Sequence, residues 1–161
     1  MKIIKRFTAL ITAMAMVMAL MPMLTLTAGA AEFTGASSGE GTKNNPYEIA
    51  TLAELEAFRD YINAGNTGEG EYFKLTANII MTPNYGKDIN GTEVSWTPIG
   101  SFNSTTDNRP FAGTFDGGGH TITGLYIDKP DVNYQGLFGY IGKGGTVKNL
   151  GLAGGSVTGS I

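Results

Sequence analysis

The chain has 161 residues, with no cysteine, 24 glycines, and 11 Lys and Arg residues against 14 Asp and Glu residues, for a formal charge of −3. The absence of cysteine excludes a disulfide scaffold, a cysteine-ligated zinc site and a cysteine nucleophile. The acidic balance excludes a basic nucleic-acid-binding protein, and a hydrophobic fraction of 42% excludes a disordered chain. The length predicts one domain and the charge predicts no nucleic-acid partner.

Residues 1–30 have the order of a secretory signal peptide. Three cations lie within the first six residues, a long uncharged stretch follows, and small residues occupy 28–31. We expect cleavage between Ala30 and Ala31, which leaves no membrane attachment; an uncleaved membrane anchor is the alternative. Either outcome predicts a chain outside the cytoplasm, secreted or held at the cell wall or surface. The remainder carries a formal charge of −6, which disfavours anionic lipid.

The next segments predict a leader and one helix. Residues 31–45 are small and polar with no apolar period, which is typical of a flexible leader. Residues 46–66 predict a short strand and then a helix, because Thr51 and Glu54 form a capping box and Gly65 can end the helix. Apolar residues follow at helical spacing: Leu52, Leu55, Phe58 and Ile62. We interpret this amphipathic helix as a cap over the end of a core; a partner-binding helix is the alternative.

Residues 67–161 predict an all-β body with an internal repeat. Short runs of β-branched and aromatic residues alternate with Gly, Asn and Asp. Residues 121–127 match 146–152 at an offset of 25, and 111–115 match 134–138 at an offset of 23. Copies this short cannot bury their own apolar face, so they must stack, which predicts a parallel β-helix, or solenoid. A sandwich of antiparallel hairpins is the alternative.

Three C-terminal segments, 136–141, 145–150 and 155–159, carry a family resemblance. They resemble the GLUG motif of bacterial cell-surface proteins, and the upstream segments 41–51, 96–100 and 111–117 resemble the usual entry to such regions. The resemblance implies a right-handed parallel β-helix, capped at its N-terminal end by the helix, on a secreted or wall-attached protein of an anaerobic Gram-positive bacterium. Such regions occur in adhesin-like proteins and ahead of the catalytic part of IgA-cleaving metallopeptidases. The family supplies no catalytic residue for this region.

The C-terminal end departs from that family pattern. Its members continue through further GLUG units, whereas this sequence stops within the strand pattern of 156–161. We expect a β-helix truncated at its C-terminus. Its open edge then predicts self-association as one way of covering it.

Several polar residues of the body are candidates for a functional site. His120 is the only histidine and follows three glycines, which favours a solvated turn over a metal ligand or general base. The segment 88–93 has a loose calcium-like spacing, but Asn-Gly favours a tight turn. The glycine clusters 117–119 and 142–145 match no phosphate loop. Four further carboxylates could supply the acidic pair of a glycan hydrolase or the acidic ligands of a lyase. We interpret them as turn-forming residues instead: Asp107, Asp116, Asp128 and Asp131.

Aromatic side chains are the remaining candidates. Tyr126, Tyr134 and Tyr140 are predicted to stack on sugars wherever they are exposed, whereas Trp96 is predicted to pack under a turn.

The sequence predicts no catalytic residue, cofactor or metal site. The first hypothesis is a non-enzymatic surface module, an adhesin-like segment or structural stalk that faces host or cell-surface glycans or proteins. The alternative is an accessory N-terminal region of a secreted hydrolase, either an IgA-type metallopeptidase or a carbohydrate-active enzyme. A third hypothesis, a small β-helical enzyme complete in itself, requires a cleft lined by several acidic and basic groups.

Overall fold

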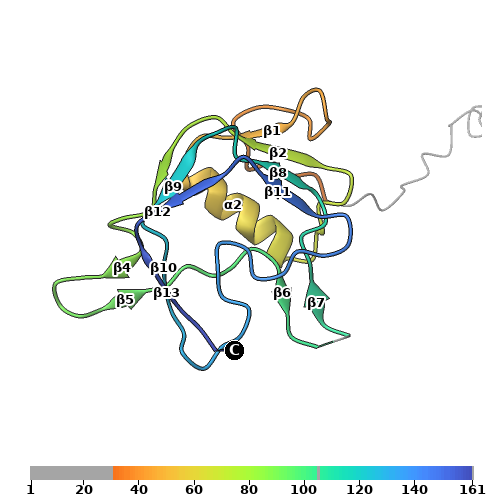
Figure 1. Ribbon diagram of the computed structural model, residues 1–161. Helices are drawn as coiled ribbons and strands as arrows, with labels where there is room; N and C mark the ends of the chain where they lie inside the picture. The colour runs from red at the N-terminus through yellow and green to blue at the C-terminus, as the bar shows by residue number, and fades with distance from the viewer. Residues whose placement is uncertain (1–30, 105, 161) are drawn as a thin grey trace, which may run out of the picture. The chain divides into compact units, whose positions relative to one another are not determined.

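The computed structural model describes residues 31–104 and 106–160. The predicted signal peptide, 1–30, lies outside them, and so does Ala30 of its cleavage site; Ala31 is the first residue described and is exposed. The described part contains helix α2 (Leu52–Asn63) and thirteen strands of two to four residues. The strands, drawn in Figure 1, are β1 (Tyr47–Ile49), β2 (Tyr72–Leu75), β3 (Ile79–Ile80), β4 (Gly86–Lys87), β5 (Glu93–Val94), β6 (Ser101–Phe102), β7 (Asn108–Arg109), β8 (Thr114–Asp116), β9 (Thr121–Thr123), β10 (Tyr126–Asp128), β11 (Thr146–Lys148), β12 (Gly151–Ala153) and β13 (Ser156–Thr158).

Helix α2 begins at the predicted capping box, which the structure confirms. The Thr51 hydroxyl accepts from the Glu54 amide at 3.2 Å, and the Glu54 carboxylate accepts from the amides of Thr51 at 2.9 Å and Ala50 at 2.7 Å. Burial raises the pKa of Glu54, but these amide donors outweigh burial and the pKa is lowered. Three residues of the predicted apolar stripe, Leu55, Phe58 and Ile62, are fully buried.

The strands form five small sheets. Three are parallel: one of four strands in the order β1-β2-β8-β11, one of three in the order β12-β9-β3, and the pair β10-β13. Two are antiparallel hairpins, β4–β5 and β6–β7. Figure 1 shows the hairpins extending beyond the parallel strands.

The prediction of a right-handed parallel β-helix over 67–161 is wrong. The strands fall into separate small sheets, none of which closes, and the two hairpins take up much of the chain between the parallel strands. The prediction relied on alternating apolar residues and glycine turns. Alternation determines only which side chains face inward, and it does not determine which strands pair with one another. The alternative of an antiparallel sandwich is also not observed, since the larger sheets are parallel.

The predicted capping role of the helix changes as well. Phe58 of α2 packs against Phe73 of β2, with ring centroids 4.5 Å apart, and against Phe115 of β8 at 5.4 Å. The helix therefore lies against the inner face of the four-stranded sheet and supplies part of its core.

The internal repeat does not give the spatial register. β9 pairs with β12 so that Ile122 lies beside Leu152, and β10 pairs with β13 so that Ile127 lies beside Val157. These partners are 30 residues apart in the chain, against the offset of 25 at which the sequence copies align. Similar apolar spacing within a copy therefore does not identify the strand that pairs with it.

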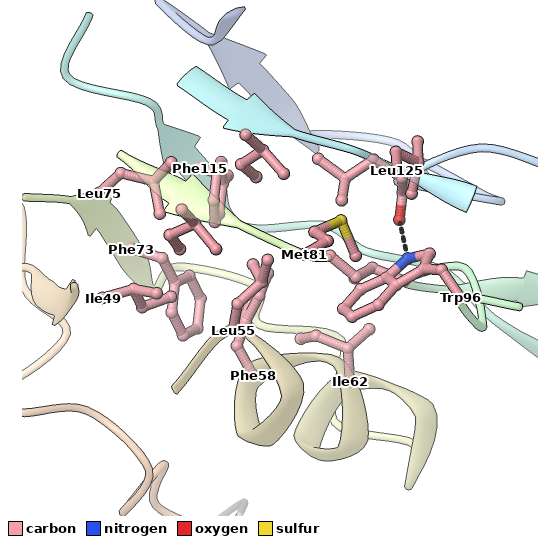
Figure 2. Close-up of a cluster of buried hydrophobic side chains, with 14 of the residues drawn as sticks. Ile49, Leu55, Phe58, Ile62, Phe73, Leu75, Met81, Trp96, Phe115 and Leu125 are labelled. Carbon is pink, nitrogen blue, oxygen red and sulfur yellow. Dashed lines mark hydrogen bonds between the residues drawn. The ribbon is translucent and has the colours of Figure 1, made fainter. Parts of the chain in front are cut away.

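The core is a continuous cluster of aromatic and aliphatic side chains around α2, shown in Figure 2. Trp96 is 1% exposed, and its indole N–H donates to the Leu137 carbonyl at 3.2 Å. The Arg59 guanidinium lies 4.7 Å from the indole centroid, a cation–π contact. The prediction that Trp96 packs under a turn is confirmed, so Trp96 has no surface on which a ligand could stack.

Part of the predicted leader joins this core. Phe33 is 5% exposed, with its ring 5.3 Å from that of Tyr47 and 5.7 Å from that of Phe73. The Ser37 amide donates to the Glu48 carbonyl, and the Glu48 amide donates to the Ser38 carbonyl. The buried Phe33, which contributes about 2 kcal/mol, and these backbone hydrogen bonds together anchor the segment.

Candidate binding groove

The polar residues singled out in the sequence lie apart from one another. In the β4–β5 loop, Asp88 accepts the amides of Asn90 at 2.8 Å and Thr92 at 2.7 Å, which confirms the tight turn. His120 is half-buried at the start of β9, and its amide donates to the Gly117 carbonyl. Within 31–104 and 106–160, no group of three or more His, Asp or Glu side chains is placed to hold a metal ion.

The four candidate carboxylates lie in loops and at strand ends. Asp107 accepts from the Asn103 side chain in the β6–β7 loop, and Asp131 is exposed in the loop after β10. Asp128 is half-buried at the end of β10, where its amide donates to the Ser95 hydroxyl at 3.0 Å. Asp116 accepts from the Gly118 amide at 2.9 Å, from Asn149 at 3.0 Å and from Lys148 at 3.3 Å. The Gly118 amide is the main cause of the lowered pKa of Asp116, which keeps it ionised and poorly suited to act as a general acid.

One of the aromatic candidates, Tyr134, lines a groove of about 730 Å³ beside the β6–β7 hairpin, termed here the hairpin groove. Its lining comes from the hairpin and from the loop 132–135 that follows β10. The segment 97–100 and the last residue of α2, Asn63, contribute the rest of the lining. Most of the lining is uncharged polar and aromatic.

Asn63 fixes the base of the hairpin. Its side-chain amide donates to the Pro98 carbonyl at 3.0 Å and accepts from the buried Gly100 amide at 2.8 Å. The Asn63 backbone carbonyl accepts from the Arg109 guanidinium. One residue at the end of the helix thus joins three points of the groove, so the hairpin is set by the core and does not depend on its own two short strands.

Three aromatic rings line or support the groove. Phe102 packs edge-on against Tyr134 at 5.5 Å and against Tyr140 at 5.3 Å. Tyr134 is 50% exposed. Its backbone has φ +58°, in the left-handed region that non-glycine residues seldom adopt. The fold therefore holds Tyr134 in an unfavourable conformation that presents its ring beside Phe102.

Tyr134 and Tyr140 were predicted as candidates by residue type, whereas Phe102, Asn63 and Arg109 were not predicted from the sequence. These residues are distant in the chain. They meet because Ile99 forms a parallel β-bridge with Phe138, and because Gly100 packs against the Tyr140 carbonyl. No local pattern signals such a long-range bridge. Tyr126, the third tyrosine named, is half-buried on β10 and does not line the groove.

The lining chemistry suits ligand binding. Arg109 is the single charged residue among the described lining residues. Its Nε lies 3.9 Å from the Asp107 carboxylate, which offsets part of its charge. Amides from Asn103, Asn133 and Gln135 add paired donors and acceptors. An exposed ring with convergent polar groups is typical of a binding site, and no nucleophile and base are paired here.

No helix within the described ranges is both long and apolar enough to cross a bilayer.

Comparisons with known proteins place this chain beside two much longer relatives. A protein described as a Gly-rich membrane protein, from Evansella cellulosilytica, is 42% identical over 130 residues, which cover 81% of this chain and 13% of the relative. Halomucin from Haloquadratum walsbyi is 36% identical over 132 residues, which cover 80% of this chain and 1% of the relative. No family model matches the chain, and no solved structure matches it. The relatives point to membrane or surface association, which is compatible with the predicted extracellular location without specifying it.

Proposed function

We propose that this chain is a binding module of an extracellular surface protein, adhesin-like and without catalysis of its own, that holds its ligand in the hairpin groove. The observation that carries the proposal is the groove itself, in which the exposed ring of Tyr134 lies beside amide and guanidinium groups. The anchoring of the hairpin by Asn63 supports a groove that exists before a ligand arrives, which lowers the ordering cost of binding.

Three further observations support a surface role. The chain is similar to segments of a protein described as a membrane protein and of halomucin, and it spans only 13% and 1% of their lengths. Its resemblance to GLUG-motif proteins, which include adhesin-like proteins, agrees with that role. The signal-like order of residues 1–30 also favours export.

Retention of coated beads under flow tests the proposal. Beads carrying the full chain are passed over immobilised mucin glycoprotein, bacterial cell-wall polysaccharide and collagen. We expect retention on at least one surface above that of albumin-coated beads, and loss of that retention when the chain is heat-unfolded before coating. Retention equal to that of albumin on all three surfaces contradicts an adhesin-like role.

A further inference from the structure

We propose that the hairpin groove takes a short neutral oligosaccharide, which stacks on Tyr134 and is hydrogen-bonded by the surrounding amides. This inference rests on the proposed function, because it names the ligand class of the same groove. It depends on three properties of the groove: the presentation of one ring, the type of polar group and the balance of charge.

The ring of Tyr134 is presented for stacking. One edge contact, to Phe102 at 5.5 Å, fixes its orientation, while 50% of the residue stays exposed. A tyrosine without this constraint would avoid the left-handed backbone, so the surrounding fold holds the ring where it is. The C–H face of a pyranose is a flat apolar surface of matching size, so stacking it on the ring removes apolar area from water while the sugar hydroxyls remain at the rim.

The polar groups suit hydroxyls. Side-chain amides carry a donor and an acceptor side by side, and adjacent sugar hydroxyls present the same pairing. Gln135 already donates to the Asn133 carbonyl at 2.8 Å, which holds its amide in place at the groove wall. Side chains of Asn103 and Asn133 line the same groove, so amides face a ligand from the hairpin and from the loop.

The charge favours a neutral ligand. Residues 31–161 carry a formal charge of −6, which repels a polyanionic polysaccharide at long range. Arg109, the one cation of the lining, already donates to the Asn63 carbonyl and lies near Asp107. Arg109 is therefore placed as a hydrogen-bond donor to a hydroxyl or ring oxygen. A volume of about 730 Å³ fits a short oligosaccharide.

The first experiment is binding of the full chain to a printed array. The array holds neutral cello-, xylo-, manno- and chito-oligosaccharides beside acidic fragments of polygalacturonate and alginate. Titration calorimetry then measures the best neutral hit. We expect a Kd on the order of 0.1–1 mM, because the groove is open to water, and little dependence on salt. Binding confined to the acidic fragments, or no binding to any glycan at about 10 mM, overturns the inference.

Tyr134→Gly is the decisive variant. Glycine adopts φ +58° without strain, so this change removes the ring and leaves the loop conformation favoured. We expect an affinity about tenfold weaker, with the melting temperature unchanged or raised. Tyr134→Phe keeps the stacking face and should bind within about twofold of the original chain.

Asn149→Gly is the matched control. Asn149 is the other described non-glycine residue with positive φ, at +52°, and it lies outside the hairpin groove. The same backbone relief at this position should leave glycan binding unchanged. If Tyr134→Gly binds as well as Asn149→Gly does, the groove is not the glycan site.

The two proposals fail in different ways. If coated beads are retained and Tyr134→Gly beads are retained equally, also in the presence of the neutral oligosaccharide, the adhesin-like role stands and the glycan site falls. If the neutral oligosaccharide binds in a Tyr134-dependent manner while beads are never retained, the glycan site stands and adhesion falls.

Discussion

Neighbouring strands in the parallel sheets share a register and differ sharply in burial. Ile122 of β9 and Ile127 of β10 are fully buried, whereas their partners Leu152 of β12 and Val157 of β13 are 54% and 48% exposed. Paired residues in parallel strands point to the same face, so pairing alone does not bury a side chain. β9 and β10 face the core that α2 fills, whereas no described residue packs over most of Leu152 and Val157. Burial in this molecule depends on the layer behind a sheet.

The largest test of this comparison replaces, in separate variants, the two members of one pair, Ile122 and Leu152. Ile122→Ala should lower the free energy of unfolding by about 2–4 kcal/mol, because it leaves a cavity against the core. Leu152→Ala should lower it by less than about 1 kcal/mol, since half of that side chain is already in water. Urea unfolding followed by tryptophan fluorescence measures both. Equal losses would show that Leu152 is packed in solution.

The contrast extends to polar contacts, for which Asn63 and Asn149 are the matched pair. Asn63→Ala leaves the buried Gly100 amide without its acceptor and should cost about 1–3 kcal/mol. Asn149→Gly removes a contact to Asp116 at an exposed position, and glycine adopts φ +52° without strain, so this change should cost less than about 0.5 kcal/mol. Chemical denaturation ranks the two. A smaller loss for Asn63→Ala than for Asn149→Gly would mean that the helix end does not hold the hairpin.

A smaller loss of stability is expected from a change at the start of α2. Thr51→Ala removes the capping acceptor of the Glu54 amide and should destabilise the chain by about 1 kcal/mol. Thr51→Ser keeps the hydroxyl and serves as the control. Thermal unfolding by circular dichroism measures both variants, and identical melting temperatures would indicate that tertiary packing alone holds the first turn.

The smallest effect concerns pH. Burial raises the pKa of Glu71 above its ordinary value of 4.5, and the Tyr61 hydroxyl at 3.0 Å offsets only part of that rise. A raised pKa in the folded state means that folding binds protons between 4.5 and that pKa, so stability falls as pH rises through this window. Glu71→Gln should flatten the fall in melting temperature from just above pH 4.5 upward.

Asp116, at the end of β8, has a pKa shift of the opposite sign. Its pKa is lowered, so its contribution is present at neutral pH and is lost as pH falls through the folded-state pKa. Asp116→Asn should remove this loss of stability at acid pH. It should leave unchanged the pH dependence that Glu71 causes above pH 4.5. Melting temperatures recorded across both windows separate the two carboxylates.

Local signals were predictable from the sequence, and long-range ones were not. Thr51 with Glu54, and the buried stripe of α2, follow from spacing within a few residues, and the structure has both. The tight turn at Asp88 follows in the same way. The β-helix and its repeat register failed because they depend on which strand pairs with which, and similar apolar runs permit several pairings.

The candidate groove falls between these cases. Tyr134 and Tyr140 were recognisable as candidates by residue type, but their exposure was not. Phe102 had no distinguishing local pattern, and its meeting with both tyrosines depends on parallel bridges across 30 or more residues. Phe33 shows the same limit on the core side, since its polar neighbours gave no sign of burial.

The β6–β7 hairpin lies between two buried residues of the chain, Ile99 and Phe111. The described residues of its tip, 103–104 and 106–107, contribute nothing to the core cluster. Insertions and deletions at that tip should therefore be accepted during evolution, while the ends stay fixed by Asn63. Under the proposal that the hairpin groove holds a ligand, changing this one loop would alter what the groove binds without disturbing the core, and an engineer could graft new loops at the same place.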